Sequence, residues 1–451
     1  MSETAAEPSS TFRPTLFHIA LIIPWVALVV GALERIWDNS YLWHIRAGSV
    51  QVESVAVLTS DTFSFTRFGD TWRTQSWLAE LGYGWLERVT GLSFTGVMVL
   101  FFGVMTMVGI GVLAWRYSRS IPATSIVVLL SSVVLPQFLV PRPALFSFPI
   151  FLMVILAWDR PAQRWMVPLL FWIWASVHGS FAIGVIYVLL RIVQKREWVA
   201  LRTAIVSGSA CLVTAHGLGV LSILWDFVEA RPYLALISEW QTPDLLEPTM
   251  APVVVAVLVV IYGAAKGRLG PDSLWIIGPF LVLAVSAERA VGPAWLALVP
   301  AVAMSLGDLK VTWARGFRLP IAWAFGVVII LLPFLFTEPA ELDEEQFPVA
   351  ASEALADVPT FHDDYTGGYL IWRWGPEKLV YIDDRAELYQ EQISESLDIR
   401  SGRLDWREPF DRYGIEQVLL LESDALADIL RAEGWATVYS DDRYLVMRPD
   451  A

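Results

Sequence analysis

Ionisable and aromatic side chains crowd a short segment that follows the first long apolar run of the chain. Asp38, Trp43, His44 and Arg46 lie within one or two helical turns of the end of that run. A carboxylate backed by aromatic rings can accept a proton from a hydroxyl group, and an imidazole can hydrogen-bond a phosphate. The alternative is an interfacial helix with an aromatic belt, whose polar residues simply face water. The residues alone leave both interpretations open.

Further ionisable residues lie inside or at the edges of other apolar runs. Because such groups are costly in a membrane, a functional role is a reasonable hypothesis for each of them. Two guanidinium groups in this set are suited to hold a lipid-linked phosphate, since arginine pairs bidentately with phosphate oxygens. The alternative is that each side chain reaches the nearest interface or pairs with a carboxylate. The residues are Arg142, His178, His216, Glu239 and Arg289.

Several signals of other chemistry are absent from the sequence. There is no Walker A loop, no GxGxxG after a strand, no HExxH and no GxSxG. Nucleotide hydrolysis and zinc proteolysis are therefore unsupported, and no basic stripe indicates a nucleic-acid partner. Cys211 is the only cysteine, which rules out an intrachain disulfide and a Cys-based zinc site.

Composition indicates what positions these residues. The chain has 451 residues, of which 55% are hydrophobic and 17% charged, and its mean hydropathy is +0.53. Such a composition predicts a helical protein that crosses the membrane many times. The stretch 165–193 is too long for one span and is broken at His178-Gly179, so we expect two helices there and eleven membrane segments in all. The other expected spans are 14–34, 93–115, 122–140, 143–157, 203–221, 250–265, 273–288, 293–306 and 319–337.

Basic residues predict the orientation of these spans. With a cytoplasmic, disordered N-terminus at 1–13, all five basic clusters fall on the cytoplasmic side, and the acidic segments 35–92 and 222–249 fall outside. We therefore expect a multi-pass protein of the cell membrane, with its membrane domain at 14–337. The clusters are Arg116/Arg119, Arg160/Arg164, Arg191/Lys195/Arg196/Arg202, Lys266/Arg268 and Lys310/Arg315/Arg318.

The remainder of the chain has a different character. From Glu338 onward the formal charge is −17, against −14 for the whole chain. An acidic linker at 338–347 is expected to join the last span to an extracytoplasmic α/β domain at 348–451. The predicted strands are 379–382, 415–421 and 444–447, and the predicted helices are 388–397 and 424–433.

Short motifs in a fixed order resemble the type C glycosyltransferase fold (GT-C), and more narrowly an uncharacterised bacterial group of such proteins. In that group the first loop usually reads Asp-x-Asp-x-x-Trp-His-x-x-x-Gly, then Asp-Pro-Phe-Ser-x-Thr and Trp-Leu. The resemblance covers nearly the whole chain. Here the motifs are Asp38 to Gly48, Asp61 to Thr66, Trp77-Leu78, Arg142-Pro143, Trp174 to Gly179, Ser238 to Trp240, Gly367 to Trp372 and Ile382 to Arg385.

The resemblance implies a membrane enzyme that transfers a sugar from a polyprenyl-phosphate donor to a glycan, lipid or protein acceptor of the cell envelope. Asp38 would be the general base, and the second acid of the pattern is replaced by Ser40, which weakens any metal-chelating role of that turn. We therefore expect no cofactor and no metal ligand. The expected contacts to substrate or lipid phosphate are His44, Arg46, Arg142, His178, Glu239 and Arg289.

Two other functions stay open at this point. A non-catalytic scaffold or assembly subunit of the same fold is favoured by Ser40 and by the lack of a clear metal site. A transporter is suggested by the broken helix at His178-Gly179, but no inverted internal repeat supports it. An enzyme needs Asp38 beside an open cavity, whereas a scaffold can have that cavity filled by side chains.

Overall fold

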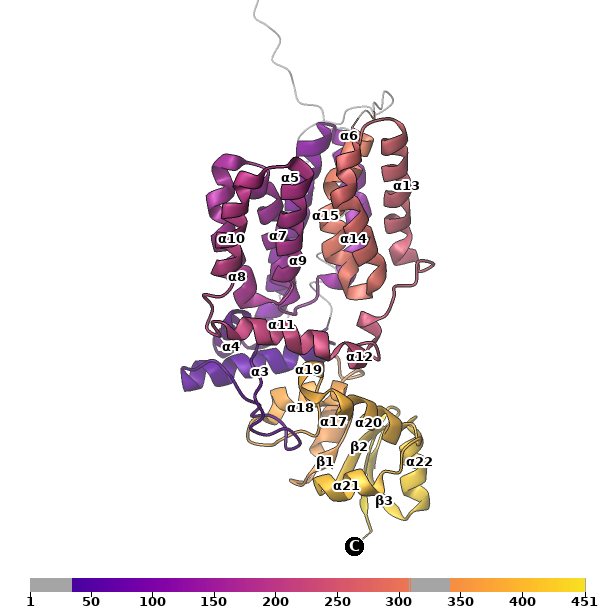
Figure 1. The fold of residues 1–451 in the computed structure, drawn as a ribbon. Helices are drawn as coiled ribbons and strands as arrows, with labels where there is room; N and C mark the ends of the chain where they lie inside the picture. Colours follow the sequence, from indigo (N-terminus) through magenta and orange to yellow (C-terminus); the bar gives the residue numbers. More distant parts are fainter. Residues whose placement is uncertain (1–34, 308, 310–340, 451) are drawn as a thin grey trace, which may run out of the picture.

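The computed structural model describes residues 35–307, 309 and 341–450. A bundle of helices occupies one end of the molecule and a smaller domain with a β-sheet occupies the other (Figure 1). Helices α3 (Asn39–Ser54), α4 (Trp77–Thr90), α11 (Gly219–Glu229) and α12 (Arg231–Leu234) lie between the two, across the end of the bundle. Residues from both parts and from this middle layer can therefore meet at one place.

The bundle is made of mostly apolar helices joined by short turns. Its turns include several 3₁₀ segments, of which Pro136–Phe138, Ser238–Trp240 and Glu288–Ala290 adjoin the site described below. The other 3₁₀ segments are Gly91–Ser93, Pro161–Met166, Trp198–Ala200, Pro248–Met250 and Pro271–Ser273. The helices are α5 (Phe94–Ser118), α6 (Ile121–Val134), α7 (Ala144–Trp158), α8 (Val167–Val177), α9 (Phe181–Lys195), α10 (Leu201–Ala210), α13 (Ala251–Ala265), α14 (Leu274–Ser286) and α15 (Val291–Leu306).

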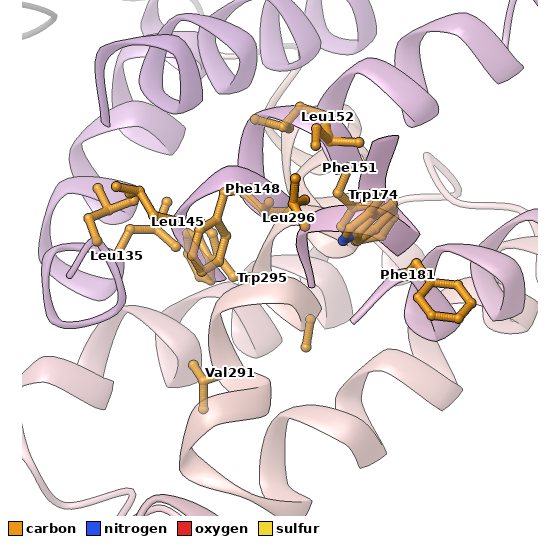
Figure 2. Close-up of a cluster of buried hydrophobic side chains, with 14 of the residues drawn as sticks. Leu135, Leu145, Phe148, Phe151, Leu152, Trp174, Phe181, Val291, Trp295 and Leu296 are labelled. Carbon is orange, nitrogen blue, oxygen red and sulfur yellow. The ribbon is translucent and has the colours of Figure 1, made fainter. Parts of the chain in front are cut away.

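Large apolar side chains fill the centre of the bundle. Leu145, Phe148 and Phe151 of α7 lie in one cluster with Trp174 of α8 and Trp295 of α15 (Figure 2). Trp295 donates a hydrogen bond from Nε1 to Ser131 Oγ at 2.8 Å, so its one polar atom is satisfied inside the core. The outward faces of α5, α13 and α14 instead expose valine, leucine and isoleucine, which is typical of helices that face lipid.

Three helical segments of the described residues are long and apolar enough to cross a membrane, namely Trp77–Ser118, Pro248–Ala265 and Glu288–Leu306. Helices α6, α7 and α14 are apolar but shorter. The predicted break at His178-Gly179 is confirmed, because α8 ends at Val177 and α9 begins at Phe181. The predicted spans 14–34 and 319–337 lie outside the described residues.

The predicted span 203–221 has the wrong bounds, because helix α10, which packs along α8 in the bundle, covers only its first part. Helix α10 ends at Ala210, and a series of turns precedes α11, which runs across the bundle end (Figure 1). Gly217 has a φ of +54°, a left-handed conformation that ends helical geometry and that glycine adopts without strain. In the same turns His216 donates a hydrogen bond from Nε2 to the carbonyl oxygen of Thr74 at 2.7 Å. A sliding hydrophobic average does not register either feature.

The C-terminal domain has a four-stranded sheet in the order β1-β2-β4-β3. Strand β1 (Thr360–Phe361) runs parallel to β2 (Gln417–Leu421), and β4 (Tyr444–Pro449) is antiparallel to both β2 and β3 (Trp435–Ser440). The helices are α17 (Val349–Glu353), α18 (Asp364–Trp374), α19 (Ala386–Tyr389), α20 (Glu391–Arg400), α21 (Arg407–Tyr413) and α22 (Ala425–Ala432). An α/β organisation is therefore present, with β1, β3, α17, α18, α19 and α21 in addition to the predicted elements.

The predicted strand 379–382 is wrong as part of this sheet, because its backbone pairs with the first loop instead. Val380 donates from its backbone N–H to the carbonyl of Phe63 at 2.8 Å and accepts from the N–H of Phe65 at 3.0 Å. Thr66 Oγ1 donates to the carbonyl of Tyr381 at 2.6 Å. These bonds attach the C-terminal domain to the loop between α3 and α4.

Glycines allow the middle layer to pack closely. A Cβ atom at Gly368 of α18 would lie 2.7 Å from the carbonyl oxygen of Asn39, and one at Gly48 of α3 would lie 1.8 Å from the carbonyl oxygen of Glu80. Neither position has room for a side chain. The start of α3 is therefore fixed between α4 and the C-terminal domain, and this fixes the direction of its polar side chains.

Candidate functional site

A cavity of about 350 Å³ lies where the bundle, the middle layer and the C-terminal domain meet. Five of the seven residues predicted as site residues line it. They come from α3, from the turn before α7, from the α8–α9 break, from the turn after α12 and from the turn before α15. These residues are His44, Arg142, His178, Glu239 and Arg289.

Asp38 caps α3 and pairs with Arg142 behind the cavity wall. One carboxylate oxygen accepts a hydrogen bond from the backbone N–H of Tyr41 at 3.0 Å, as expected of an N-cap residue. The other oxygen accepts from Nε of Arg142 at 2.6 Å. The side chain of Asp38 is only 1% exposed. Because Asp38 is buried, paired with Arg142 and absent from the cavity lining, this geometry disfavours the general-base role that the motif implied for it.

Arg142 joins Asp38 to the turn that follows α12. Its Nη1 lies 2.6 Å from Oε1 of Glu239. Burial alone would raise the pKa of the Glu239 carboxyl, but the guanidinium groups of Arg142 and Arg289 outweigh it and lower that pKa below its ordinary value. Glu239 is therefore ionised at neutral pH and neutralises part of the charge of Arg142.

Arg289 contributes the second guanidinium group of the cavity. Its Cζ atom lies 4.4 Å from the centre of the Trp240 ring, a cation–π contact that fixes the side chain without neutralising it. Phe227 stacks on Trp240 at 6.3 Å and supports that ring. Within 35–307, 309 and 341–450, no carboxylate forms an ion pair with Arg289. The guanidinium is therefore positioned to receive an anion from the cavity.

His44 is held by a buried carboxylate that the sequence did not single out. Its Nδ1 lies 2.8 Å from Oε1 of Glu80, which is fully buried in α4. Because an ionised carboxylate only accepts hydrogen bonds, Nδ1 carries the proton and Nε2 is the other polar atom of the ring. Gln51 donates to the same carboxylate at 2.7 Å. The imidazole is thus fixed in one orientation at the cavity wall.

His178 presents the opposite arrangement at the break between α8 and α9. The backbone N–H of Ser180 donates to Nδ1 of His178 at 3.1 Å, so the proton of the neutral ring is on Nε2. Gln75, another cavity residue, accepts a hydrogen bond from the N–H of Gly179 at 3.1 Å. The helix break predicted from the sequence therefore places a hydrogen-bond donor in the cavity wall.

Arg46 lies outside the cavity, so the geometry does not support its predicted contact to substrate or lipid phosphate. Its Nε donates to the carbonyl oxygen of Gly375, and its Nη2 lies 3.2 Å from Oε2 of Glu377. Both partners belong to the C-terminal domain. Arg46 follows the cavity-lining residue His44 by two positions in α3, so its side chain points in another direction. It contacts the C-terminal domain and helps to hold that domain in place.

Sequence reasoning missed two acidic cavity residues of the C-terminal domain. Asp384 accepts hydrogen bonds from Ser40 Oγ and, at 2.5 Å, from Trp43 Nε1. Glu387 accepts from Trp72 Nε1 at 3.1 Å. The motif from Ile382 to Arg385 was the signal in the sequence, but it did not assign a role to Asp384. In the same motif Arg385 Nη2 lies 2.6 Å from Asp383 Oδ2.

No protein-family model matches the sequence, and no curated protein matches it. A similar solved structure is the crystal structure of ArnT from Cupriavidus metallidurans bound to undecaprenyl phosphate, with a TM-score of 0.52 and 13% sequence identity. The match covers 96% of this chain and 98% of that chain. At this identity the likeness establishes the fold alone. The chain is accordingly a membrane protein with the type C glycosyltransferase fold, as its motifs predicted.

Proposed function

We propose that the protein is a membrane glycosyltransferase that takes a sugar from a polyprenyl-phosphate donor and transfers it to an acceptor of the cell envelope. The observation that carries this proposal is the polar cavity of about 350 Å³, with Arg142 and Arg289 in its wall. The fold supports it, because ArnT, which has the same fold, was crystallised with undecaprenyl phosphate.

The two arginines suit the change of charge during transfer. The phosphodiester of a lipid-linked sugar carries one negative charge, and the departing lipid phosphate gains a second. Fixed cations near the departing oxygen stabilise that charge more in the transition state than in the bound donor. Arg142 shares its charge with Asp38 and Glu239, whereas Arg289 has only Trp240 as a close partner among the described residues. Arg289 is therefore the stronger phosphate ligand in this proposal.

The remaining cavity residues are assigned to the sugar and the acceptor. His44 and His178 each have one imidazole nitrogen engaged and one that can bond a hydroxyl or phosphate oxygen. The proposal requires no cofactor, and a metal is not part of it because Ser40 removes an acid from the turn that would chelate one. A lipid-linked sugar, membrane lipid and a glycan, lipid or protein acceptor are the proposed partners, and nucleic acid is not.

The topology is proposed from the basic clusters. Eleven spans in 14–337, an acidic linker at 338–347 and an extracytoplasmic domain at 348–451 would place the cavity at the outer face of the cell membrane. A lipid headgroup and a water-borne acceptor can meet at that face.

A pair of reporter fusions tests the proposed orientation. An alkaline phosphatase fused after Ala451 is expected to be active, because this enzyme matures only outside the cytoplasm. A fusion after Arg268 is expected to be inactive, while a green fluorescent protein at the same point is bright. Finding both positions on one side of the membrane would contradict the eleven-span topology.

A non-catalytic scaffold remains the second candidate function. The engagement of Asp38 with Arg142 favours it, because the acid assigned as base does not line the cavity. The cavity itself favours the enzyme, since side chains do not fill it and ionisable groups surround it. A scaffold has no need for an arginine such as Arg289, which lies in the cavity wall without an ionic partner among the described residues.

Binding of undecaprenyl phosphate separates the proposed function from a scaffold that binds no lipid phosphate. The protein in nanodiscs is expected to bind this lipid, and Arg289→Ala is expected to weaken binding about 10- to 100-fold, because a charge-assisted hydrogen bond contributes about 1.5–3 kcal/mol. Arg88→Ala is the matched control: Arg88 pairs with Glu53 on the exposed face of α4, 2.6 Å away. Equal binding by wild type and Arg289→Ala would contradict the assignment of Arg289.

A further inference from the structure

We infer that Asp384, which the C-terminal domain contributes to the cavity, is the base that accepts the proton of the acceptor hydroxyl. The inference rests on the proposed function and names the group that activates the acceptor. It also gives the C-terminal domain a direct part in the chemistry.

Two hydrogen bonds hold the Asp384 carboxylate at the cavity wall. Ser40 Oγ donates to one oxygen, and Trp43 Nε1 donates to the other at 2.5 Å. Both donors belong to α3, one helical turn apart, and both line the cavity with Asp384. A carboxylate oxygen has two lone pairs, so each oxygen can still accept a proton or a hydrogen bond from a ligand.

The other acids near the cavity are less suited to this role. Asp38 is 1% exposed and does not line the cavity, and Glu239 is paired with Arg142. Asp364 lines the cavity, but the charged groups with the largest effect on its carboxyl are Asp363 and Arg400. Both belong to the C-terminal domain and not to the phosphate site. Glu387 remains as a real competitor, because it lines the same wall and accepts one bond from Trp72.

Asp384 also lies in the electrostatic field of the phosphate site. Arg142 and Arg289 both interact with its charge. An acceptor hydroxyl bound to Asp384 would therefore lie close to a donor whose phosphate is held by these arginines. Glu387 interacts with Arg289 but is not among the groups with the largest effect on Arg142.

The environment of Asp384 gives it the proton affinity of a base that works near neutral pH. The pKa of Asp384 is raised to about 7, because burial and the charges of Asp383 and Asp38 together outweigh the hydrogen bond from Ser40 and the charge of Arg142, which lower it. The other charged or titratable groups of the cavity lining are Arg385, Glu387, His44, His178, Glu239, Arg289, Asp364 and Tyr365. A general base is most effective when its pKa lies close to the working pH.

In the proposed step, the acceptor oxygen forms a bond to the anomeric carbon of the sugar while the bond from that carbon to the phosphate oxygen breaks. The phosphate oxygen keeps the electron pair and leaves as polyprenyl phosphate. The proton of the acceptor hydroxyl moves to Asp384 and then to water when the cavity opens to solvent.

The test follows release of undecaprenyl phosphate from a panel of undecaprenyl-phosphate-linked hexoses and pentoses, by protein in nanodiscs between pH 5.5 and 8.5. This readout registers transfer to any acceptor, including water. The wild-type rate is expected to rise with pH to a plateau above about pH 7, because only the ionised carboxylate accepts a proton. Asp384→Asn is expected to release the lipid 10²–10⁴-fold more slowly, with no inflection near pH 7 and with unchanged binding of undecaprenyl phosphate.

Two further variants guard against a folding defect. In Asp384→Ala, added formate is expected to restore part of the rate by replacing the missing carboxylate. Asp398→Asn, in an exposed pair with Arg403, is the matched control and is expected to retain the wild-type rate and pH profile. Equal thermal unfolding midpoints of Asp384→Asn and wild type would show that the loss is chemical.

The outcomes separate the inference from the function on which it rests. A wild-type protein that neither binds undecaprenyl phosphate nor releases it from any donor would overturn the proposed function and the inference together. Wild-type release with an unchanged rate and pH profile in Asp384→Asn would overturn the inference alone. A large loss in Glu387→Gln without one in Asp384→Asn would assign the base to Glu387 and would also overturn it.

Discussion

Arg142→Met is expected to weaken binding of undecaprenyl phosphate by up to about 10-fold, less than Arg289→Ala does, and to destabilise the helical domain by roughly 3 kcal/mol. The variant keeps the length of the side chain but leaves the Asp38 carboxylate, 1% exposed, without its cation. Removal of one member of a buried ion pair costs about 3–5 kcal/mol. The lower end applies here because Asp38 keeps the bond from the Tyr41 N–H and because the Arg142 side chain is 23% exposed.

A double-mutant cycle separates the structural and the chemical parts of this prediction. Asp38→Asn should preserve the helix cap, because asparagine caps as well as aspartate. Adding it to Arg142→Met should restore most of the thermal unfolding midpoint but none of the lipid binding. Asp38→Asn alone should retain both lipid binding and turnover. If this variant kept its stability and its binding but lost turnover 10²–10⁴-fold, Asp38 would be the base, as its motif first implied.

The cycle addresses a general difficulty of reading a site from short motifs. The segment from Asp38 to Gly48 contributes Ser40, Trp43 and His44 to the cavity lining. The motif did not indicate which side chains face a ligand. Asp38 turns inward to cap a helix and pair with Arg142, whereas Ser40, two residues later, lines the cavity. That division depends on where α3 begins, and a single sequence does not fix helix ends closely.

The convergence of distant residues was predicted only in part. The sequence drew attention to Arg142, His178, His216, Glu239 and Arg289 as ionisable residues in or beside apolar runs, and all of them except His216 line one cavity. Each was noticed because an ionisable group is conspicuous in an apolar sequence. Asp384 and Glu387 lie in an acidic domain, where a carboxylate is ordinary, so composition did not distinguish them from their neighbours.

Secondary structure shows the same dependence on context. Helix positions in the bundle were predicted well where one apolar run is one helix, as in α5, α7 and α13. The run 203–221 failed because hydrophobicity does not reveal the turns before Gly219. The segment 379–382 was read as a sheet strand because it has the residues of one. In the fold its partner is the first loop, more than 300 residues earlier, and no local pattern predicts such a pairing.

Ser40 illustrates how a departure from a motif can mislead. Its hydroxyl in place of an acid favoured a scaffold, because one carboxylate was missing from the turn. In the fold this hydroxyl donates to the carboxylate of Asp384, so an acid is present at that point in space although not at that point in the sequence. Because Asp384 supplies this carboxylate, the replacement of the acid by Ser40 is only weak evidence against an enzyme.

Arg385→Met is expected to destabilise the contact between the C-terminal domain and the first loop more than any other single substitution considered. Arg385 is 2% exposed and lies between two carboxylates that are fully buried. Its Nη2 atom is 2.7 Å from Asp61 of the first loop and 2.6 Å from Asp383 of its own domain. Its guanidinium also lies over the Trp72 ring, 4.5 Å from its centre. Without the cation, two buried carboxylates would face each other.

The expected cost is roughly 4–5 kcal/mol, the upper end for a broken buried ion pair, because two anions lose one shared cation. The matched control is Arg407→Met, since Arg407 pairs with Glu433 at 2.6 Å but is 51% exposed, and its substitution should leave the free energy of unfolding nearly unchanged. Urea titration of each intact variant in nanodiscs, monitored by tryptophan fluorescence, measures the loss of unfolding free energy. Adding Asp61→Asn and Asp383→Asn to Arg385→Met should recover stability, because the unpaired charges are then absent.

If Arg385→Met unfolds at the urea concentration of the wild type, the arginine is not what joins the loop to the domain. The hydrogen bonds between residues 63–66 and 380–381 would then be sufficient to hold Asp384 at the cavity.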